Sequence, residues 1–165
     1  MFLHCGEFTP RVWVNRKLDK LICVGKNYLE HAKEFPGEAI PEKPVLFLKP
    51  PSTIVKAAHF GDRVRVTLPI GRGAVHHECE IVVRLGPGLK PDAVTLGLDL
   101  TLREVQADLK KKGHPWELAK VFDGSAVLGP WIPLSDDALE FLDWEFEFLV
   151  DGLTKQKSRG REMRL

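Results

Sequence analysis

Short apolar runs separated by Gly and Pro give most of this chain the pattern of a sheet. Two compact runs, at 21–24 and 45–48, are followed by strand-like segments at 64–66, 75–85 and 94–100. Runs of this length, rich in Val, Ile and Leu and bounded by turn residues, are typical of β-strands. The pattern predicts a mainly β protein with short helices, in the α+β class.

Two short helices are expected among these strands. Asn27 can cap a lid-like helix over residues 28–35, which is followed at once by a Pro-Gly pair. Thr101 and Glu104 have the spacing of a capping box, and the apolar stripe that follows them ends at Gly113. We therefore expect the second helix to start with that box.

A β-hairpin is the clearest prediction near the end of the chain. Residues 144–150 alternate between apolar and polar types, and Asp151 and Gly152 come next. An Asp-Gly pair after an alternating run favours a two-residue hairpin turn. The partner strand is expected at 153–157.

Length and composition indicate one domain. The chain has 165 residues, of which 44% are hydrophobic, and this is enough apolar material for a core. We expect residues 1–20 to form a short leading segment and residues 21–165 to form the main domain.

Charge and cysteine usage restrict the partners and the compartment. Lys plus Arg number 24 and Asp plus Glu number 23, so no strong field would attract nucleic acid. No apolar stretch has the length of a membrane span. Cys5, Cys23 and Cys79 are odd in number and widely spaced, which favours buried thiols over disulfides. We expect a cytoplasmic protein without nucleic-acid or membrane partners.

Two glutamates two residues apart are the main candidates for chemistry. Side chains alternate along a strand, so Glu78 and Glu80 share one face and Cys79 points the other way. Two neighbouring carboxylates on an apolar strand repel each other unless a cation lies between them. Oxygen ligands of this kind suit Mg²⁺, Mn²⁺ or Ca²⁺.

Two other interpretations of this strand stay open. His76 lies on the same face as Glu78 and Glu80, so an iron or zinc site with one histidine and two glutamates is an alternative. A strand with a solvated glutamate face and a buried Cys79 face needs no metal at all.

Several blocks of sequence, in a fixed order, resemble the fumarylacetoacetate hydrolase family. They are VGKNYLEH at 24–31, PVLFLKP at 44–50, HECE at 77–80, LDLT at 98–101, REVQ at 103–106, GHPWELAK at 113–120, FDG at 122–124 and LGP at 128–130. Together with the late hairpin they cover residues 21 to 157. The nearest resemblance is to the acylpyruvase and oxaloacetate decarboxylase branch.

This resemblance implies a fold, an assembly and a metal. The expected fold is a mixed β-sheet roll, and the expected assembly is a homodimer. A Mg²⁺ or Mn²⁺ ion would be held by carboxylates that match Glu78, Glu80 and Asp99. Asp99 also has a physical reason for its place, because it comes just before a predicted helix start, where the helix dipole favours an anion.

The family match also implies a catalytic dyad. His31 and Glu34 are three residues apart on the expected lid helix, so they share a face and are able to act as an oriented general base. Without the resemblance, the same two residues would be interpreted as ordinary surface residues of a short polar helix.

Four further residues are candidates for contact with the substrate. Lys49 and Lys120 each end an apolar stretch, so their ammonium groups either face the substrate or extend to solvent along buried stems. We assign Lys120 a catalytic role, as a stabiliser of an oxyanion, and Lys49 a role in substrate binding. Arg103 and Gln106 lie on adjacent turns of the second helix and are expected to bind the substrate.

The activity implied by the family is cleavage of small 2,4-dioxo acids to pyruvate and a carboxylate. The same metal-held 2-oxo acid would also serve an oxaloacetate decarboxylase or a 2-hydroxydienedioate isomerase. The partner is therefore a small 2-oxo acid, and the enzyme is a hydrolase of carbon-carbon bonds or one of these alternatives.

The end of the sequence departs from the family pattern. The later strands of the family, with a Gly-Thr-Pro block, have no counterpart after residue 157. One expectation is therefore a catalytic domain that lacks its C-terminal strands. Two alternatives follow from it, namely an inactive fragment that retains the metal site and a metal-binding β module without catalysis.

Overall fold

A long antiparallel strand pair, β5 (Val75–Leu85) with β6 (Pro91–Leu102), is at the centre of the fold.

The computed structural model describes residues 2–3, 18–28, 43–135 and 139–163. The strands are β1 (Phe2–Leu3), β2 (Leu21–Gly25), β3 (Val45–Lys49), β4 (Ile54–Lys56), β5 (Val75–Leu85), β6 (Pro91–Leu102), β7 (Ala126–Leu128), β8 (Ile132–Pro133), β9 (Glu145–Val150) and β10 (Leu153–Arg159). The helices are α2 (Arg103–Lys112) and α3 (Glu117–Lys120), and 3-10 turns cover Pro51–Thr53, Pro87–Leu89, Glu140–Asp143 and Gly160–Glu162.

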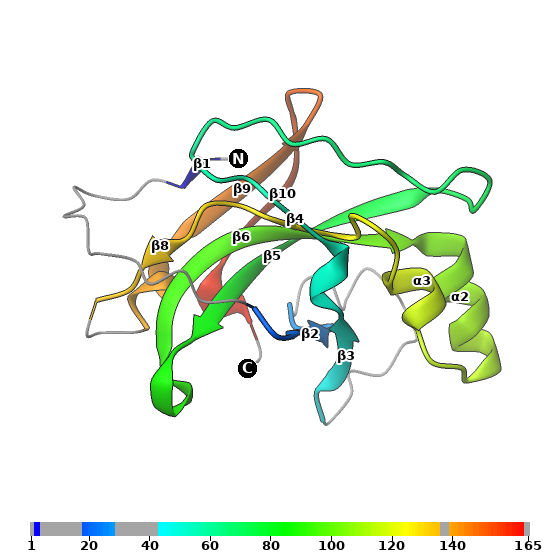
Figure 1. The fold of residues 1–165 in the computed structure, drawn as a ribbon, viewed down its shortest axis with the longest axis horizontal. Helices are drawn as coiled ribbons and strands as arrows, with labels where there is room; N and C mark the ends of the chain where they lie inside the picture. Colours follow the sequence, from blue (N-terminus) through cyan, green and yellow to red (C-terminus); the bar gives the residue numbers. More distant parts are fainter. Residues whose placement is uncertain (1, 4–17, 29–42, 136–138, 164–165) are drawn as a thin grey trace.

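Three sheets make up the described part of the chain. The largest has the order β4-β7-β6-β5, with β8 also paired to β6, and it is mixed because β4 and β7 run parallel while β5, β6 and β7 pair antiparallel. The others are β2-β3 and β1-β9-β10. Figure 1 shows β5 and β6 as a long curved pair with α2 and α3 beside one end. This arrangement confirms the predicted α+β class with a mixed sheet.

One face of the β5-β6 pair forms the core. Cys79 is fully buried and packs with Leu96, Phe146 and Tyr28, while Ile81 lies against the same cluster. Cys79 therefore faces the core, as the alternation along the strand predicts. Glu78 and Glu80, on either side of Cys79, therefore lie on the opposite face of the strand pair.

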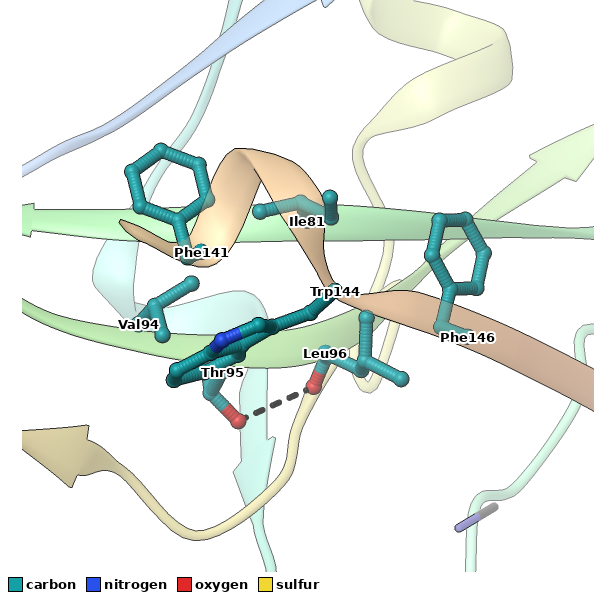
Figure 2. Close-up of a pocket in the computed structure, with 7 residues that line it drawn as sticks. All are labelled: Ile81, Val94, Thr95, Leu96, Phe141, Trp144 and Phe146. Carbon is teal, nitrogen blue, oxygen red and sulfur yellow. Dashed lines mark hydrogen bonds between the residues drawn. The ribbon is translucent and has the colours of Figure 1, made fainter. Parts of the chain in front are cut away.

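A second apolar cluster closes the core at the far end of β6. Figure 2 shows Phe141 and Trp144 lying against Val94 and Leu96, with the Thr95 hydroxyl donating to the Leu96 carbonyl at 3.2 Å. The cavity between them has a volume of only about 10 Å³. That space holds no more than about one water molecule, so this region is packed core.

The second helix begins differently from its prediction. The structure starts α2 at Arg103, and no side chain caps it. Thr101 instead continues strand β6, while the Glu104 carboxylate accepts a hydrogen bond from the amide of Ala74 at 2.9 Å. The capping box is therefore wrong, because strand pairing retains Thr101 in the sheet. The predicted end is confirmed, since Gly113 adopts a left-handed conformation with φ 66°.

The short run at 64–66 is not a strand, although its sequence alternates. The structure places these residues in an irregular segment between β4 and β5. Three residues without a neighbouring strand gain no ladder hydrogen bonds, and strand propensity alone is too weak to order them. This prediction is wrong for lack of a pairing partner.

The late hairpin is confirmed. β9 and β10 pair antiparallel around Asp151 and Gly152, whose φ angles are 51° and 76°, with a shift of register between Thr154 and Gln156. Two consecutive positive φ angles are the signature of the turn that best matches the twist of paired strands. The second strand extends to Arg159, two residues further than predicted.

The predictions for the cysteines, for the first helix and for membrane spans are tested only where the residues are described. Burial raises the pKa of the Cys23 and Cys79 thiols to about 12, and both cysteines are free. Cys5 and the expected helix at 28–35, apart from Tyr28, lie outside the described residues. In the described part of the chain, no helix is long and apolar enough to cross a membrane.

One side chain joins the hairpin to the edge of β5. Gln156 on β10 accepts a hydrogen bond from the Cys79 amide at 3.1 Å and donates to the Cys79 carbonyl at 2.7 Å. A side-chain amide thus replaces a neighbouring strand at this point of the sheet edge. The backbone between Glu78 and Glu80 is held in place by this pair of bonds.

We predict that Gln156→Glu destabilises the protein by about 1–3 kcal/mol, because a carboxylate cannot donate to the Cys79 carbonyl and repels it. Urea denaturation of the variant measures the loss. Lys155→Gln, at an exposed neighbouring position, is the matched control and is expected to retain the wild-type midpoint. Equal midpoints for the Gln156→Glu variant and the wild-type chain would contradict this account.

Candidate functional site

Three carboxylates meet on the face of the β5-β6 pair opposite the core. Glu78 lies directly across from Asp99 in the strand register, and Glu80 lies across from Gly97. All three acidic residues line one cavity of about 790 Å³. A side chain at Gly97 would have no room, because its Cβ would lie 2.9 Å from a methyl carbon of Val82 and 3.0 Å from a backbone oxygen of the next strand. The close strand packing therefore brings the acidic groups together.

The ammonium of Lys120 bridges two of these carboxylates. Its Nζ lies 2.7 Å from Glu78 Oε2 and 2.6 Å from Asp99 Oδ2, and it donates to the Thr101 hydroxyl at 2.7 Å. Only 3% of Lys120 is exposed, so its charge is buried and does not extend to solvent. Burial by itself would lower the pKa of Lys120, but the two neighbouring carboxylates raise it above its ordinary value.

Lys49 lies on the other side of Asp99. Its Nζ is 2.9 Å from Asp99 Oδ1, and only 1% of Lys49 is exposed. Burial lowers the pKa of Lys49, and the Asp99 carboxylate opposes that shift. Asp99 thus has one ammonium group beside each of its oxygens, and the alternative of solvated lysine tips does not apply to Lys49 or Lys120.

Arg103 and Gln106 stand at the cavity wall on the first turn of α2. Arg103 Nη1 donates to Gln106 Oε1 at 2.9 Å and lies 3.7 Å from Glu78 Oε1. Gln106 is buried, whereas about a quarter of the Arg103 side chain is exposed. The structure therefore brings both residues to the acidic end of the cavity, where α2 follows directly from β6.

Glu80 is the carboxylate with the least compensation. The described residues form no hydrogen bond or ion pair with its side chain. Burial, together with the negative charges of Glu78 and Asp99, raises the pKa of Glu80 to about 8. An ionised Glu80 is thus unfavourable until a cation approaches it.

The donor set fits a hard divalent cation. Besides the uncompensated Glu80, Asp99 Oδ1 is buried and accepts no hydrogen bond from the described residues. In the side-chain conformations of this structure, no three His, Cys, Asp or Glu residues of the described chain lie close enough together to hold one metal ion. Binding of an ion by all three carboxylates would therefore require the Lys120 ammonium to move from between Glu78 and Asp99.

The sequence predicts roles for two histidines, of which only His76 lies among the described residues. His76 is exposed on β5 and is absent from the described lining of the cavity, which gives no support to an iron or zinc site. His31 and Glu34 lie outside the described residues, so their dyad stays a prediction.

Thr101 is the residue of this site that sequence reasoning missed. It was expected to cap a helix, but its hydroxyl accepts a hydrogen bond from Lys120. The signal was present in the sequence, because Thr101 comes two residues after Asp99 and therefore shares its strand face. The same spacing argument that groups Glu78 with Glu80 applies here.

The sequence of the chain matches a protein-family model and several known proteins. The family model described as fumarylacetoacetate (FAA) hydrolase C-terminal matches residues 20–165. The chain is 36% identical to the oxaloacetate tautomerase YcgM of Escherichia coli, over 92% of this chain and 73% of that protein.

Solved structures give the same assignment. The crystal structure of fumarylpyruvate hydrolase from Pseudomonas aeruginosa, in complex with Mn²⁺ and pyruvate, matches with a TM-score of 0.79 and 28% identity, over 94% of this chain and 74% of that one. The 2-hydroxyhepta-2,4-diene-1,7-dioate isomerase of Mycobacterium marinum matches with a TM-score of 0.67 and 31% identity, over 88% and 52% of the two chains. The chain thus spans between half and three quarters of the length of these relatives.

The raised pKa of Glu80 predicts that, in a chelating buffer, the protein loses stability as the pH rises. The folded pKa of about 8 lies above the ordinary value of 4.5, so the penalty is absent below pH 4.5 and complete above about pH 8. Chemical denaturation at several pH values within this window is expected to show a falling free energy of unfolding. Glu80→Gln should flatten that dependence, because its side chain carries no charge.

The control for this experiment is Glu117→Gln, which changes an exposed glutamate outside the cavity and should retain the wild-type slope. A Glu80→Gln variant that loses stability as steeply as the wild-type chain over the same window would show that this carboxylate is not the cause.

Proposed function

Because this chain belongs to the fumarylacetoacetate hydrolase family, we propose that its carboxylate-lysine site is a metal-dependent enzyme site for small 2-oxo acids. The reaction that we propose first is keto-enol tautomerisation of oxaloacetate. The observation that carries this proposal is the buried ammonium of Lys120, held among Glu78, Asp99 and Thr101 at the wall of the large cavity. The named activity of the E. coli relative supports the choice of reaction.

Glu78, Glu80 and Asp99 are proposed to hold the metal. Their oxygens suit Mg²⁺ or Mn²⁺, with Ca²⁺ as a further choice, and the Mn²⁺ in the P. aeruginosa relative supports a divalent ion. When bound, such an ion would polarise the 2-oxo group and offset the negative charge of an enolate. With a pKa of about 8, Glu80 carries a proton at neutral pH, and binding of the ion would release that proton.

Lys120 and the start of α2 are proposed to act on the substrate directly. When the carboxylates bind a cation, the Lys120 ammonium is free to turn towards the substrate, where it donates a hydrogen bond to the developing enolate oxygen. Arg103 is proposed to bind the substrate carboxylate, and Gln106 is proposed to orient Arg103, which the hydrogen bond between them supports. These groups line one end of the cavity, which is where we propose that the substrate binds.

Hydrolysis of acylpyruvates is the second candidate reaction. It needs a general base to activate water, and His31 with Glu34 is the proposed dyad for that role. The fumarylpyruvate hydrolase relative, with pyruvate bound, supports a carbon-carbon bond cleavage at a site of this fold. Decarboxylation and dienedioate isomerisation share the same enolate and stay as alternatives. The predicted homodimer and the cytoplasmic location also remain predictions.

We predict that the chain, with Mg²⁺ or Mn²⁺ present, accelerates the loss of the oxaloacetate enol, followed by its ultraviolet absorbance. Lys120→Met should lower the rate by about 10²–10³-fold, because it removes the donor that stabilises the enolate oxygen. Lys111→Met, at an exposed position of α2, is the matched control and should retain the wild-type rate. Equal rates for Lys120→Met and the wild-type chain would refute the assigned role of Lys120.

A companion measurement separates turnover from binding alone. The midpoint temperature of thermal unfolding is expected to rise with added Mn²⁺. It should rise again when oxalate is added as an enolate analogue, since both ligands bind the folded state. Both shifts without any turnover would mean a binding module. No shift with either ligand would contradict the metal site itself.

Product analysis with acetylpyruvate tests the hydrolase alternative. Release of pyruvate and acetate, abolished by His31→Ala, would favour hydrolysis over tautomerisation as the main reaction. If His31→Ala leaves such a release unchanged, the proposed dyad is wrong.

A further inference from the structure

We propose that Lys49 is a positioning residue, which fixes Asp99 and the end of α3 and does not itself contact the substrate. The inference deepens the proposed function and rests on the proposed metal site. It differs from the substrate-binding role expected from the sequence, because the contacts of this ammonium lie almost wholly within the protein.

The hydrogen bonds of Lys49 connect three separate segments of backbone. Nζ donates to the carbonyls of Leu100 at 3.2 Å, Lys120 at 2.5 Å and Ser125 at 2.9 Å. These carbonyls belong to β6, to the last residue of α3 and to the residue before β7. An ammonium group has three N–H donors, so these three carbonyls use all of them. Lys49 therefore joins β3 to the elements that carry the site.

The fourth neighbour of Lys49 is Asp99, and its contact is of another kind. Nζ lies 2.9 Å from Asp99 Oδ1, yet that oxygen receives no hydrogen bond from the described residues. With three carbonyls around the same ammonium, the contact with Oδ1 is chiefly one of opposite charges at short range. This arrangement orients a carboxylate while retaining its ability to bind a cation.

Lys49 also fixes the backbone position from which the Lys120 side chain projects. The 2.5 Å bond to the Lys120 carbonyl fixes the final residue of α3, a helix of only four residues that has little stability of its own. The Lys120 side chain projects from that residue to Glu78 and Asp99. One buried ammonium thus supports both the acidic and the basic side of the site.

The partners of the two lysines explain their different roles. Lys120 is bonded to side chains, which are able to rearrange when a cation or a substrate binds. Lys49 is bonded to main-chain carbonyls, which the strands hold in place. Lys49 borders the cavity, but with 1% of the residue exposed it has almost no surface to offer a ligand. A turn towards the substrate would take a donor from all three carbonyls. The Ser125 carbonyl would keep its bond from the Leu100 amide at 2.9 Å, so the cost would fall mainly on the carbonyls of Leu100 and Lys120.

The test compares two binding constants, measured by calorimetry for Lys49→Met, Lys49→Arg and the wild-type chain. Both variants are expected to bind Mn²⁺ about 10- to 100-fold more weakly, as is typical when the support of a metal ligand is removed. Oxalate should bind the Mn²⁺-saturated variants within twofold of its wild-type affinity. Lys49→Arg retains the charge without the three-carbonyl geometry, so its loss of affinity separates positioning from simple charge.

The opposite pattern would overturn the inference. Wild-type affinity for Mn²⁺ in both variants, with oxalate binding at least tenfold weaker, would make Lys49 a substrate contact. Failure of the wild-type chain itself to bind Mn²⁺ would instead refute the proposed metal site, and the two failures are thus distinguishable.

A measurement on the wild-type chain covers the case in which the variants do not fold. The ¹⁵N resonance of the Lys49 ammonium should shift when Mg²⁺ is added and should stay in place when oxalate follows, whereas the Lys120 resonance should respond to oxalate. A Lys49 resonance that moves with oxalate as much as that of Lys120 would overturn the positioning role.

Discussion

Compensation of buried charge is the constraint on which the rest of this structure depends. Two lysines and two carboxylates lie within hydrogen-bond distance of one another on this sheet face, and both lysines are almost completely buried. Each of these charges would be expensive to bury alone, and removal of a single partner leaves another uncompensated. Each of four elements contributes one of these partners: Lys49 from β3, Glu78 from β5, Asp99 from β6 and Lys120 from α3. Glu80, at the edge of the group, has no such partner among the described residues, and its raised pKa keeps it uncharged at neutral pH.

The fold meets this constraint through strand register. The pairing of Glu78 with Asp99 across β5 and β6 fixes which carboxylates are neighbours, and a shift by one residue would turn them into the core. The hairpin contributes from the other side, since Gln156 holds the backbone of Cys79 between the two glutamates. The register of β5 with β6 therefore determines both the apolar face and the acidic face of this strand pair.

The sequence predicts local relations well and distant ones poorly. Alternation alone places Glu78 and Glu80 on one face, and the Asp-Gly pair predicts the hairpin. The proximity of Asp99 came from the family resemblance, because no local rule relates strands that are twenty residues apart. The contacts of Lys49 and Gln156 depend on segments up to 77 residues away, so no spacing rule reveals them. Thr101 shows a different failure, because the local spacing of a capping box predicts a helix start there, whereas pairing with β5 retains the residue in strand β6.

The central claim is that Glu78, Glu80 and Asp99, which share this sheet face, form a site for a divalent cation. Anomalous diffraction from crystals grown with Mn²⁺ tests it most directly. The account predicts a single strong peak in contact with the carboxylates of Glu78, Glu80 and Asp99, with the Lys120 ammonium displaced from between Glu78 and Asp99. No peak at these carboxylates in Mn²⁺-saturated crystals, with Lys120 still bridging the pair, would contradict it.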